Sequence, residues 1–346
     1  MPIRLNRNIN FLLISCLLAL SLTGCGTLPP DPSKGLPVIS TGTGYPPVTI
    51  TNFDAAGNLA EYTYRQIPTR VVVTHPGATE LLLELGLEDR ILATVAPYGP
   101  PLERLREKYA KTKIFQAQYA PSREEILDLE PDMVIGWPHH FSENVFGDIQ
   151  SWHTRGVATF IVPSTLRQTK PLLENNVYAY IADIGKIFGI PDQANQYIQD
   201  CRQRVARVEA AVRNIPQKKT VLVLQDHLDG KFSLYDSSYL VSSLIASAGG
   251  QHIGDTLTAI VGAEEVLSHD PDFILFVSVN RKDAAKDLTD QEAITHLKGI
   301  RELQSMRAIE QGNIINVPFF SVNNGGVRII DVVEKIAKTL YPECFD

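Results

Sequence analysis

The sequence lacks the motifs that mark the common classes of enzyme. Its 346 residues contain no G-x-S-x-G nucleophile elbow, no G-x-x-x-x-G-K-[ST] phosphate loop and no strand–G-x-G-x-x-G–helix unit, since Gly42 and Gly44 are followed by no third glycine. Asp226 and His227 are candidates for an acid–base pair, but the sequence places no nucleophile beside them. We therefore predict no catalytic residues; an exported α/β hydrolytic enzyme is the competing class.

Signatures of metal and nucleic-acid binding are missing as well. No C-x-x-C, H-E-x-x-H or paired Cys/His spacing occurs, so we predict no structural metal site and no intrinsic cofactor. Basic residues form no run, and the formal net charge of −7 becomes −9 without residues 1–24, which carry two arginines and no acid. An acidic body argues against nucleic acid as a partner. With 44% hydrophobic and 21% charged residues, the chain can bury two cores of ordinary size.

Apolar runs long enough for a comfortable membrane span are also missing. The apolar run at residues 9–22 is too short for one, and it follows Arg4 and Arg7 as the h-region of a secretory signal does. The next residues, L-T-G-C (22–25), resemble the lipobox of bacterial lipoproteins, in which the cysteine is diacylated and becomes the first residue. We predict a signal peptide over residues 1–24 and a lipid anchor on Cys25. An ordinary signal peptide with an incidental cysteine is the alternative.

Cysteine is scarce, and only two thiols outlast this processing. Cys16 leaves with the signal peptide and Cys25 carries the lipid, which leaves Cys201 and Cys344. The two can pair outside the cytoplasm, but Cys201 lies on the apolar stripe of a predicted helix, where a buried thiol is the common outcome. Residues 25–47 are rich in Pro, Gly, Ser and Thr and predict a flexible tether between anchor and body.

One stretch, residues 191–216, is strongly amphipathic. Pro191 suits its first turn and Pro216 its end, and polar residues fill the face opposite the apolar ones. At 1.5 Å per residue, residues 192–212 make a helix of roughly 31 Å. The apolar stripe consists of Ala194, Tyr197, Ile198, Cys201, Val205, Val208 and Val212.

A repeated segment flanks this helix. E-E-I-L-D-L-E-P-D-M-V-I (124–135) and E-E-V-L-S-H-D-P-D-F-I-L (264–275) share Glu-Glu, Leu and Pro-Asp at an offset of 140 residues. Each reads as a short helix opened by two acids, then a turn, then a buried strand. We interpret the pair as two similar lobes joined by one helix; chance repetition of a common α/β unit is the alternative.

The alternation of strands and helices predicts an α/β fold with two lobes, each a small, mostly parallel sheet flanked by helices, joined by a single long α-helix. We assign the N-terminal lobe to residues 48–190, the joining helix to 191–216 and the C-terminal lobe to 217–346. The expected strands are 48–53 and 59–64 in a hairpin, then 70–74, 91–95, 132–137, 158–163, 220–225, 231–235, 273–277 and 313–318; the other expected helices are 75–86, 170–188, 239–250 and 327–342.

Residues that follow the strands are candidates for a ligand site, because ligands of parallel sheets lie beyond the carboxyl ends of the strands. Two facing lobes bring an aromatic, histidine-rich and partly apolar set into one cleft, which suits a large, flat or metal-chelating ligand. Solvated loop histidines, core aromatics and a turn shaped by His75 are the plainer accounts. The candidates are His75, Tyr98, Trp137, His139, His140, His227, Tyr235, Arg281, Phe319, Phe320 and Asn323, while His252, His269 and His296 receive no role.

The order of these features resembles one family. The lipobox, the tether, the block R-V-V-V-T-H-P-G-A-T-E-L-L-L-E-L-G-L-E-D-R-I-L-A-T, the two repeats and the long helix are similar to the substrate-binding proteins of ABC importers for ferric siderophores, haem and cobalamin. The similarity covers residues 48–342 and implies two lobes, modest closure and no catalysis. It also implies capture of a small-molecule metal chelate outside the cytoplasm and delivery to an ABC permease. We expect a lipid-anchored monomer.

The resemblance extends to permease docking. In the family, a glutamate at the head of each repeat docks onto basic pockets of the permease, and those positions here are Glu124 and Glu264. Acids in the first turn of a helix also stabilise it through the helix dipole, by about 0.3–1 kcal/mol each. Both roles are compatible, and we predict docking because the pair is symmetric across the lobes.

The ligand class stays open at this point, with a ferric siderophore first and cobalamin or haem as alternatives. Trp137 stands where the cobalamin-binding member also has a tryptophan, and histidines such as His75, together with Tyr98, can ligate haem iron. Arg281 and Arg328 can pair with siderophore oxygens, unless Arg328 faces solvent on the last helix. His75 departs from the family, in which many relatives carry Ser or Asn at that position.

Overall fold

The computed structural model describes residues 45–116, 120–166, 171–254, 260–283, 286–323 and 325–345. The predicted signal peptide, Cys25 and the tether up to residue 44 therefore lie outside the described residues. Within the described ranges, no helix combines the length and the apolar content that crossing a membrane requires.

The N-terminal lobe begins with the predicted hairpin, in which β1 (Val48–Phe53) pairs antiparallel with β2 (Leu59–Tyr64). Its turn is fixed by Asp54, whose Oδ1 accepts hydrogen bonds from the backbone N–H groups of Ala56 and Asn58 at 2.9 and 2.8 Å. The hairpin is held by this turn and by hydrogen bonds that the side chains of Asn52 and Tyr64 donate to the carbonyl oxygens of Ile161 and Thr159.

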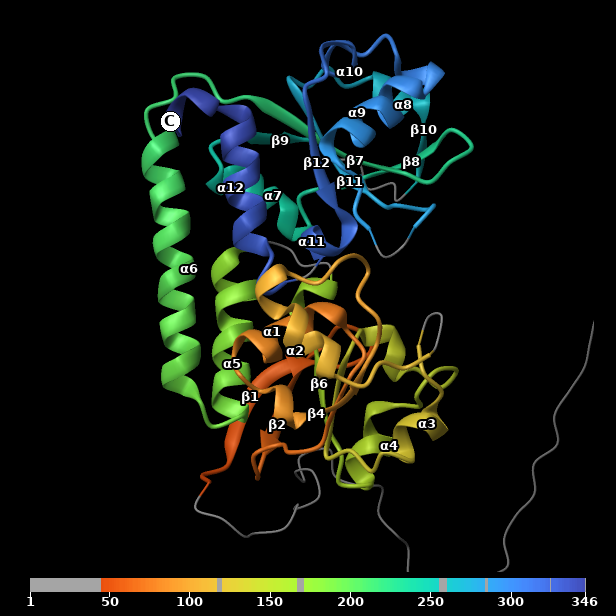
Figure 1. Ribbon diagram of the computed structural model, residues 1–346, viewed down its shortest axis with the longest axis vertical. Helices are drawn as coiled ribbons and strands as arrows, with labels where there is room; N and C mark the ends of the chain where they lie inside the picture. Colours follow the sequence, from red (N-terminus) through yellow and green to blue (C-terminus); the bar gives the residue numbers. More distant parts are fainter. Residues whose placement is uncertain are drawn as a thin grey trace, which may run out of the picture. The chain divides into compact units, whose positions relative to one another are not determined.

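A four-stranded parallel sheet forms the centre of this lobe, in the order β4-β3-β5-β6 (Figure 1). Its strands read as short apolar runs because the central residues are buried on both faces. The strands are β3 (Val71–Val73), β4 (Ile91–Thr94), β5 (Met133–Gly136) and β6 (Ala158–Ile161), and the helices are α1 (Pro76–Glu84), α2 (Arg106–Lys111), α3 (Arg123–Leu127), α4 (Ile149–Thr154) and α5 (Ala179–Ile187).

The C-terminal lobe has its own sheet, in the order β10-β8-β7-β11-β12, with β9 also paired to β7. Only the pairings of β8 with β7 and β10 are antiparallel, so the predicted mostly parallel sheet is confirmed in both lobes. The strands are β7 (Thr220–Asp226), β8 (Lys231–Leu234), β9 (Gln251–Ile253), β10 (Val261–Gly262), β11 (Phe273–Ser278) and β12 (Ile314–Pro318); the helices are α7 (Leu240–Ser247), α8 (Ala263–Leu267), α9 (Asp290–Gly299), α10 (Arg307–Gln311), α11 (Phe319–Asn323) and α12 (Ile329–Leu340).

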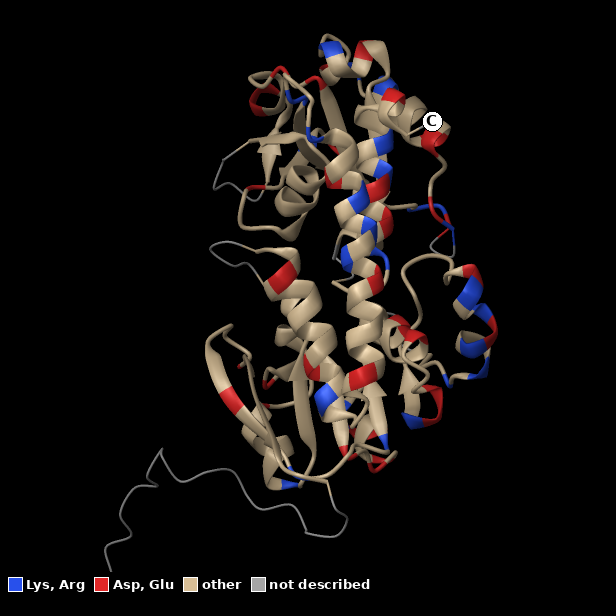
Figure 2. Cartoon of the chain, turned by 90° about the vertical axis from the view of Figure 1, so that its left-hand side faces the viewer, with Lys and Arg blue, Asp and Glu red and all other residues tan. Residues whose placement is uncertain are grey.

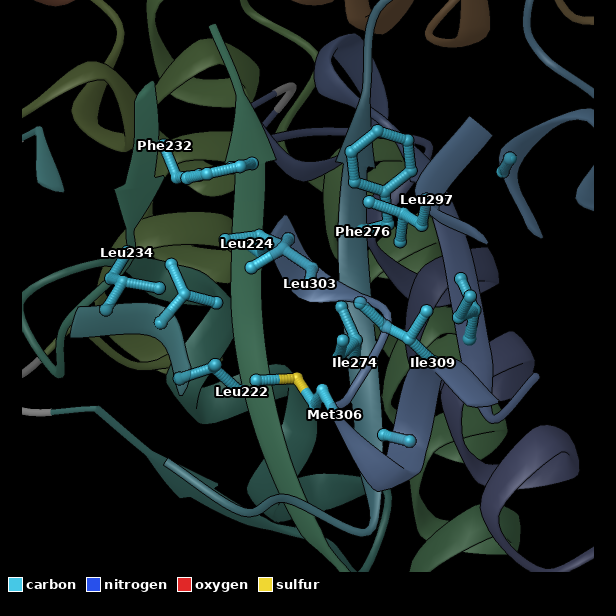
Figure 3. Packing of buried hydrophobic residues seen from close by; sticks show 14 of the residues in the cluster. Leu222, Leu224, Phe232, Leu234, Ile274, Phe276, Leu297, Leu303, Met306 and Ile309 are labelled. Carbon is cyan, nitrogen blue, oxygen red and sulfur yellow. The ribbon is translucent and has the colours of Figure 1, made fainter. Parts of the chain in front are cut away.

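Each lobe packs a separate hydrophobic core. In the C-terminal lobe, Leu224 of β7 and Phe276 of β11 belong to a cluster completed by α9, α10 and the loop between them (Figure 3). In the N-terminal lobe, Trp152 of α4 belongs to a different cluster around Val72 and Val134 of the sheet. Two cores follow from two sheets, because a sheet must cover its apolar faces with its own helices.

The predicted long helix is α6 (Pro191–Val212), and it packs on α5 of the N-terminal lobe and on α12 and α7 of the C-terminal lobe (Figure 1). Charged residues are frequent along α6 (Figure 2), and Arg204 forms ion pairs with Asp331 and Glu334 of α12 at 2.6 and 2.8 Å. The helix ends at Val212, four residues before the predicted boundary at 216. The turn at Ile215 fits this earlier end, because a residue before proline disfavours the α conformation.

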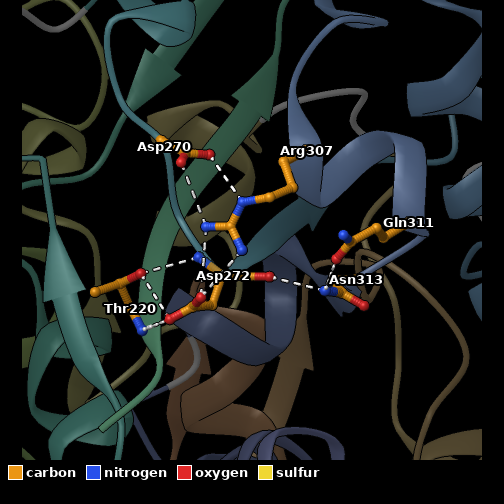
Figure 4. A network of polar contacts seen from close by, with 6 residues as sticks. All are labelled: Thr220, Asp270, Asp272, Arg307, Gln311 and Asn313. Atoms are coloured by element: carbon orange, nitrogen blue, oxygen red, sulfur yellow. Dashed lines mark hydrogen bonds and ion pairs between the residues drawn. The ribbon is translucent and has the colours of Figure 1, made fainter. Parts of the chain in front are cut away.

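Both repeats fold as predicted, into a short helix followed by a strand: α3 then β5, and α8 then β11. The aspartates that the repeats share, Asp132 and Asp272, form the same kind of hydrogen bonds. Asp132 accepts hydrogen bonds from the backbone N–H groups of Thr69 and Arg70, at the start of β3. Asp272 accepts from the N–H and hydroxyl of Thr220, at the start of β7, within the network of Figure 4. Each Pro-Asp turn therefore fixes the entry of a neighbouring central strand.

The buried thiol predicted for Cys201 is confirmed. Its side chain is buried on α6, and burial raises the pKa of the thiol to about 11. Cys201 and Cys344 are both free thiols, so they do not pair in this structure.

Candidate ligand-binding site

A cavity of about 290 Å³ lies between the two lobes. The N-terminal lobe contributes Pro97 and Tyr98, from the segment that follows β4. The C-terminal lobe contributes residues at the carboxyl ends of β7, β11 and β12, where parallel sheets bind ligands. Its lining residues from that lobe are Gln225, Ser278, Val279, Asn280, Lys286, Asp287 and Phe319. Two of the predicted residues, Tyr98 and Phe319, thus meet across the lobes.

Predicted residues also lie directly behind this lining. Tyr235 is buried, and its hydroxyl donates to Oε1 of Gln225 at 2.9 Å, so it holds a lining residue in place. Phe320 is buried with its ring edge-on to Tyr98, at 6.0 Å between ring centroids. Asn323 ends α11, and its side chain lies outside the described part of the chain.

Arg328 joins the lobes behind the cavity. Its guanidinium donates to both carboxylate oxygens of Glu80, on α1, at 2.8 and 2.6 Å, and to the carbonyl oxygen of Pro100 at 2.7 Å. The side chains of Arg328 and Glu80 are 8% and 0% exposed, and the guanidinium lies over the Phe320 ring at 4.8 Å. The alternative that Arg328 faces solvent is therefore wrong. Contact between Arg328 and a ligand stays a prediction, and it requires this pair to open.

The predicted histidine–tryptophan group forms a separate cluster on the N-terminal lobe. His75 caps α1: its Nδ1 accepts a hydrogen bond from the backbone N–H of Ala78 at 3.1 Å. Burial lowers the pKa of His75 to about 3, so the ring is neutral and can accept this bond. This geometry explains the departure from the family, because Ser or Asn at an N-cap provides the same acceptor through oxygen.

The other members of this cluster surround His75. The half-buried Trp137 ring lies 4.6 Å from His75 and 5.8 Å from the exposed His139, between centroids. His140 is buried, its Nδ1 lies 2.8 Å from the Thr74 hydroxyl, and burial lowers its pKa to about 3. As far as the structure describes the cavity, its lining includes none of the four. Among the described residues, no group of three or more His, Cys, Asp or Glu side chains is arranged to hold a metal ion.

A second cavity, of about 680 Å³, lies in the C-terminal lobe and shares Val279, Asn280 and Lys286 with the first. Arg281 lines it and donates to the carbonyl oxygen of Asp226 at 3.0 Å. The lining is otherwise rich in charge of both signs. The two cavities adjoin each other at these shared residues.

His296, which received no role from the sequence, lines the second cavity. Its Nε2 lies 2.8 Å from Oδ2 of Asp226, and its ring stacks on Phe276 in the wall of the second cavity. The candidate pair of Asp226 with His227 is wrong. His227 is exposed in the β7–β8 turn and contacts the hydroxyl of Ser233 at 2.7 Å. No sequence pattern could have indicated the contact between Asp226 and His296, because 70 residues separate them.

The comparisons with known proteins agree with this geometry. Residues 71–319 match the sequence model of the family described as periplasmic binding protein. The chain belongs to the periplasmic binding protein family. It is thus a substrate-binding protein of an ABC importer that works outside the cytoplasm, and it is not an enzyme.

Individual members of the periplasmic binding protein family show how far the similarity extends. An ABC transporter substrate-binding lipoprotein of Bacillus subtilis, YvrC, is 23% identical, over 95% of this chain and 96% of its own. A cobalamin-binding protein of Halobacterium salinarum is 23% identical, over 95% and 84%. The siderophore-binding protein BauB, solved with two acinetobactin molecules and ferric iron, has a TM-score of 0.66 and 20% identity, over 85% and 99%. This last likeness shows the fold.

The two glutamates of this protein that are predicted to dock on the permease occupy equivalent positions in the two repeats. Glu124 lies in the first turn of α3 and Glu264 in the first turn of α8, and both are exposed. Neither forms an ion pair within the part of the chain that the structure describes. Their role stays a prediction.

Proposed function

We propose that this protein captures a corrinoid such as cobalamin between its lobes and delivers it to an ABC permease. A corrinoid is a large cobalt chelate with an apolar ring and neutral carboxamide side chains. The cavity offers matching chemistry, because its lining combines Pro97, Tyr98 and Phe319 with hydrogen-bonding side chains, of which Gln225, Ser278 and Asn280 are neutral and Lys286 and Asp287 are charged. The curated relatives that bind cobalamin support the same choice.

The pairing of the cations near the cavity favours a corrinoid over a ferric siderophore, which was the first hypothesis from the sequence. An anionic chelate calls for unpaired cations at the cavity, and Arg328 is held by the buried carboxylate of Glu80 instead. Lys286 at the shared edge lies 3.1 Å from the carboxylate of Asp283.

A ferric siderophore is the second candidate. It is favoured by the exposed Arg281 and Lys282 in the wall of the larger cavity, where a ligand that extends beyond the interlobe cavity would meet them. The fold shared with BauB supports a chelate of this size.

We propose further that the protein works as a lipid-anchored monomer. Acylation of Cys25 would hold it at the membrane through the tether, which keeps the body mobile above the surface. The equivalent positions of Glu124 and Glu264, one on each lobe, support a docking surface that reaches across both lobes.

Equilibrium dialysis tests the ligand. Purified protein from residue 26 onward is dialysed against cyanocobalamin, a ferric hydroxamate, a ferric catecholate and haem, each measured by its own absorbance. We expect one corrinoid bound per chain and weaker binding of the anionic chelates. Binding of a ferric siderophore without any binding of the corrinoid would replace the first candidate by the second.

A further inference from the structure

The cavity contains a buried hydroxyl without a partner. Ser278 is the last residue of β11, its side chain is 3% exposed, and it lines the interlobe cavity. Among the described residues, its Oγ has no hydrogen-bond partner. Leaving a buried polar group unsatisfied costs free energy, so such a group at a binding cavity points to a bond that forms with the ligand.

Two carboxamides beside Ser278 are oriented by their own contacts. Gln225 uses its Oε1 to accept from Tyr235, and Asn280 uses its Oδ1 to accept from the backbone N–H groups of Lys282 and Asp283, both at 3.1 Å. Each carbonyl oxygen already accepts a hydrogen bond that orients its side chain, and among the described residues the amide N–H groups remain as donors for a ligand. With the hydroxyl of Ser278, this side of the cavity is a set of donors.

Asp287 adds an acceptor to this set. Its carboxylate lines the cavity, and its Oδ1 lies so close to Gly99 that a Cβ there would approach it to 2.6 Å. Partial burial raises the pKa of this carboxyl, and Arg328 and Glu80, whose charges act on it in opposite directions, pair with each other. Asp287 forms no hydrogen bond within the described ranges of the chain.

Three donors and one carboxylate match the hydrogen-bonding groups of a ligand that carries carboxamides. A carboxamide presents a carbonyl oxygen to a donor and an N–H group to an acceptor, whereas a carboxylate or catecholate presents oxygens only. We propose that Ser278, Gln225, Asn280 and Asp287 form one wall of the cavity that hydrogen-bonds the peripheral carboxamides of a corrinoid. Asp287 repels ligands that carry a carboxylate at the same place. This inference rests on the proposed corrinoid function and names the residues that select within it.

Dialysis with cobalamin and its monocarboxylic acids tests the wall, since each acid replaces one peripheral carboxamide by a carboxylate. We expect the unmodified protein to bind cobalamin at least roughly tenfold more tightly than one of the acids, because a close pair of like charges is strongly unfavourable. Asp287→Asn should reduce that ratio to roughly threefold or less. Ser278→Ala should weaken cobalamin binding by roughly threefold to tenfold, the usual effect of one net hydrogen bond.

Matched variants separate this effect from misfolding. Ser278→Cys keeps the shape at a slightly larger volume but donates weakly, so it should lose about as much affinity as Ser278→Ala. Asp229→Asn, in the exposed β7–β8 turn, and Ser268→Ala, at the end of α8, should bind as the unmodified protein does, and thermal unfolding of all variants checks their folding. If cobalamin binds and the Ser278 and Asp287 variants keep both affinity and selectivity, the wall is refuted and the function stands. If no corrinoid binds to the unmodified protein, both proposals fall.

Discussion

Replacing Arg328 by methionine should strongly destabilise the protein. The change leaves the carboxylate of Glu80, which is 0% exposed, without its two charge-assisted hydrogen bonds. It also removes the bond to the Pro100 carbonyl and the contact with the Phe320 ring. Breaking a buried ion pair by removing one partner costs about 3–5 kcal/mol, because an uncompensated charge stays buried.

The double variant Glu80→Met with Arg328→Met distinguishes the cost of an unpaired buried charge from the cost of losing the ion pair itself. Here no buried charge is left alone, and replacing a buried pair by apolar groups of similar volume is often neutral or stabilising. The double variant should therefore recover most of the lost free energy of unfolding, with a coupling energy of about 2–4 kcal/mol.

Urea unfolding followed by circular dichroism and by tryptophan fluorescence measures these changes. Trp137 and Trp152 both lie in the N-terminal lobe, so fluorescence reports that lobe while circular dichroism reports both. Arg307→Met is the control, because Arg307 pairs with exposed or half-exposed aspartates (Figure 4), and such pairs contribute about 0–1 kcal/mol. A cost below about 1 kcal/mol for Arg328→Met, or a double variant as unstable as the single one, would refute the buried-pair argument.

Three further predictions concern acid stability, docking and anchoring. The pKa of His75 is about 3 in the folded state against an ordinary 6.5, so the unfolded chain takes up its proton first and stability falls as pH drops below 6.5. His75→Asn keeps the N-cap acceptor but removes the proton-binding group. Between pH 7.5 and pH 5.5, the free energy of unfolding of this variant should fall by about 1.4 kcal/mol less than that of the unmodified protein. Thermal unfolding at the two pH values measures this, and an equal fall in both proteins would contradict the prediction. Reversing both Glu124 and Glu264 to lysine should abolish ligand uptake by cells while dialysis shows unchanged ligand affinity, whereas the matched reversal of Glu103, an exposed acid on the N-terminal lobe, should leave uptake intact. Cys25→Ala should release the exported protein from the membrane fraction; retention in that fraction would argue against the lipid anchor.

The architecture was predictable because it rests on local, periodic patterns. The 3.6-residue stripe of α6, the apolar runs of the central strands and the repeated Pro-Asp turns are each patterns within one element or between two neighbouring ones. β9 and β10 escaped prediction, since Q-H-I and V-G lack the continuous β-branched run that marks the equally short β3. Boundaries moved for a local reason too, as at Ile215 before Pro216.

The site was predictable only in part. Tyr98 and Phe319, selected by the rule that ligands lie beyond strand ends, line one cavity, and their contact with a ligand stays a prediction. The rule did not separate them from His75 and Trp137, which also follow strands but cluster elsewhere. Strand ends share an edge of a sheet, yet the direction of each side chain depends on the packing around it.

By itself, the sequence determined two lobes, the long helix between them and the residue types available at the strand ends. Only the tertiary structure decided which of these residues meet. Glu80 and Arg328 are 248 residues apart and Asp226 and His296 are 70 apart, and no local pattern links either pair. The physical reason is that a buried polar group acquires its partner only when elements distant in the sequence pack together, as Arg328 does with Glu80, whereas the Oγ of Ser278 has no hydrogen-bond partner among the described residues.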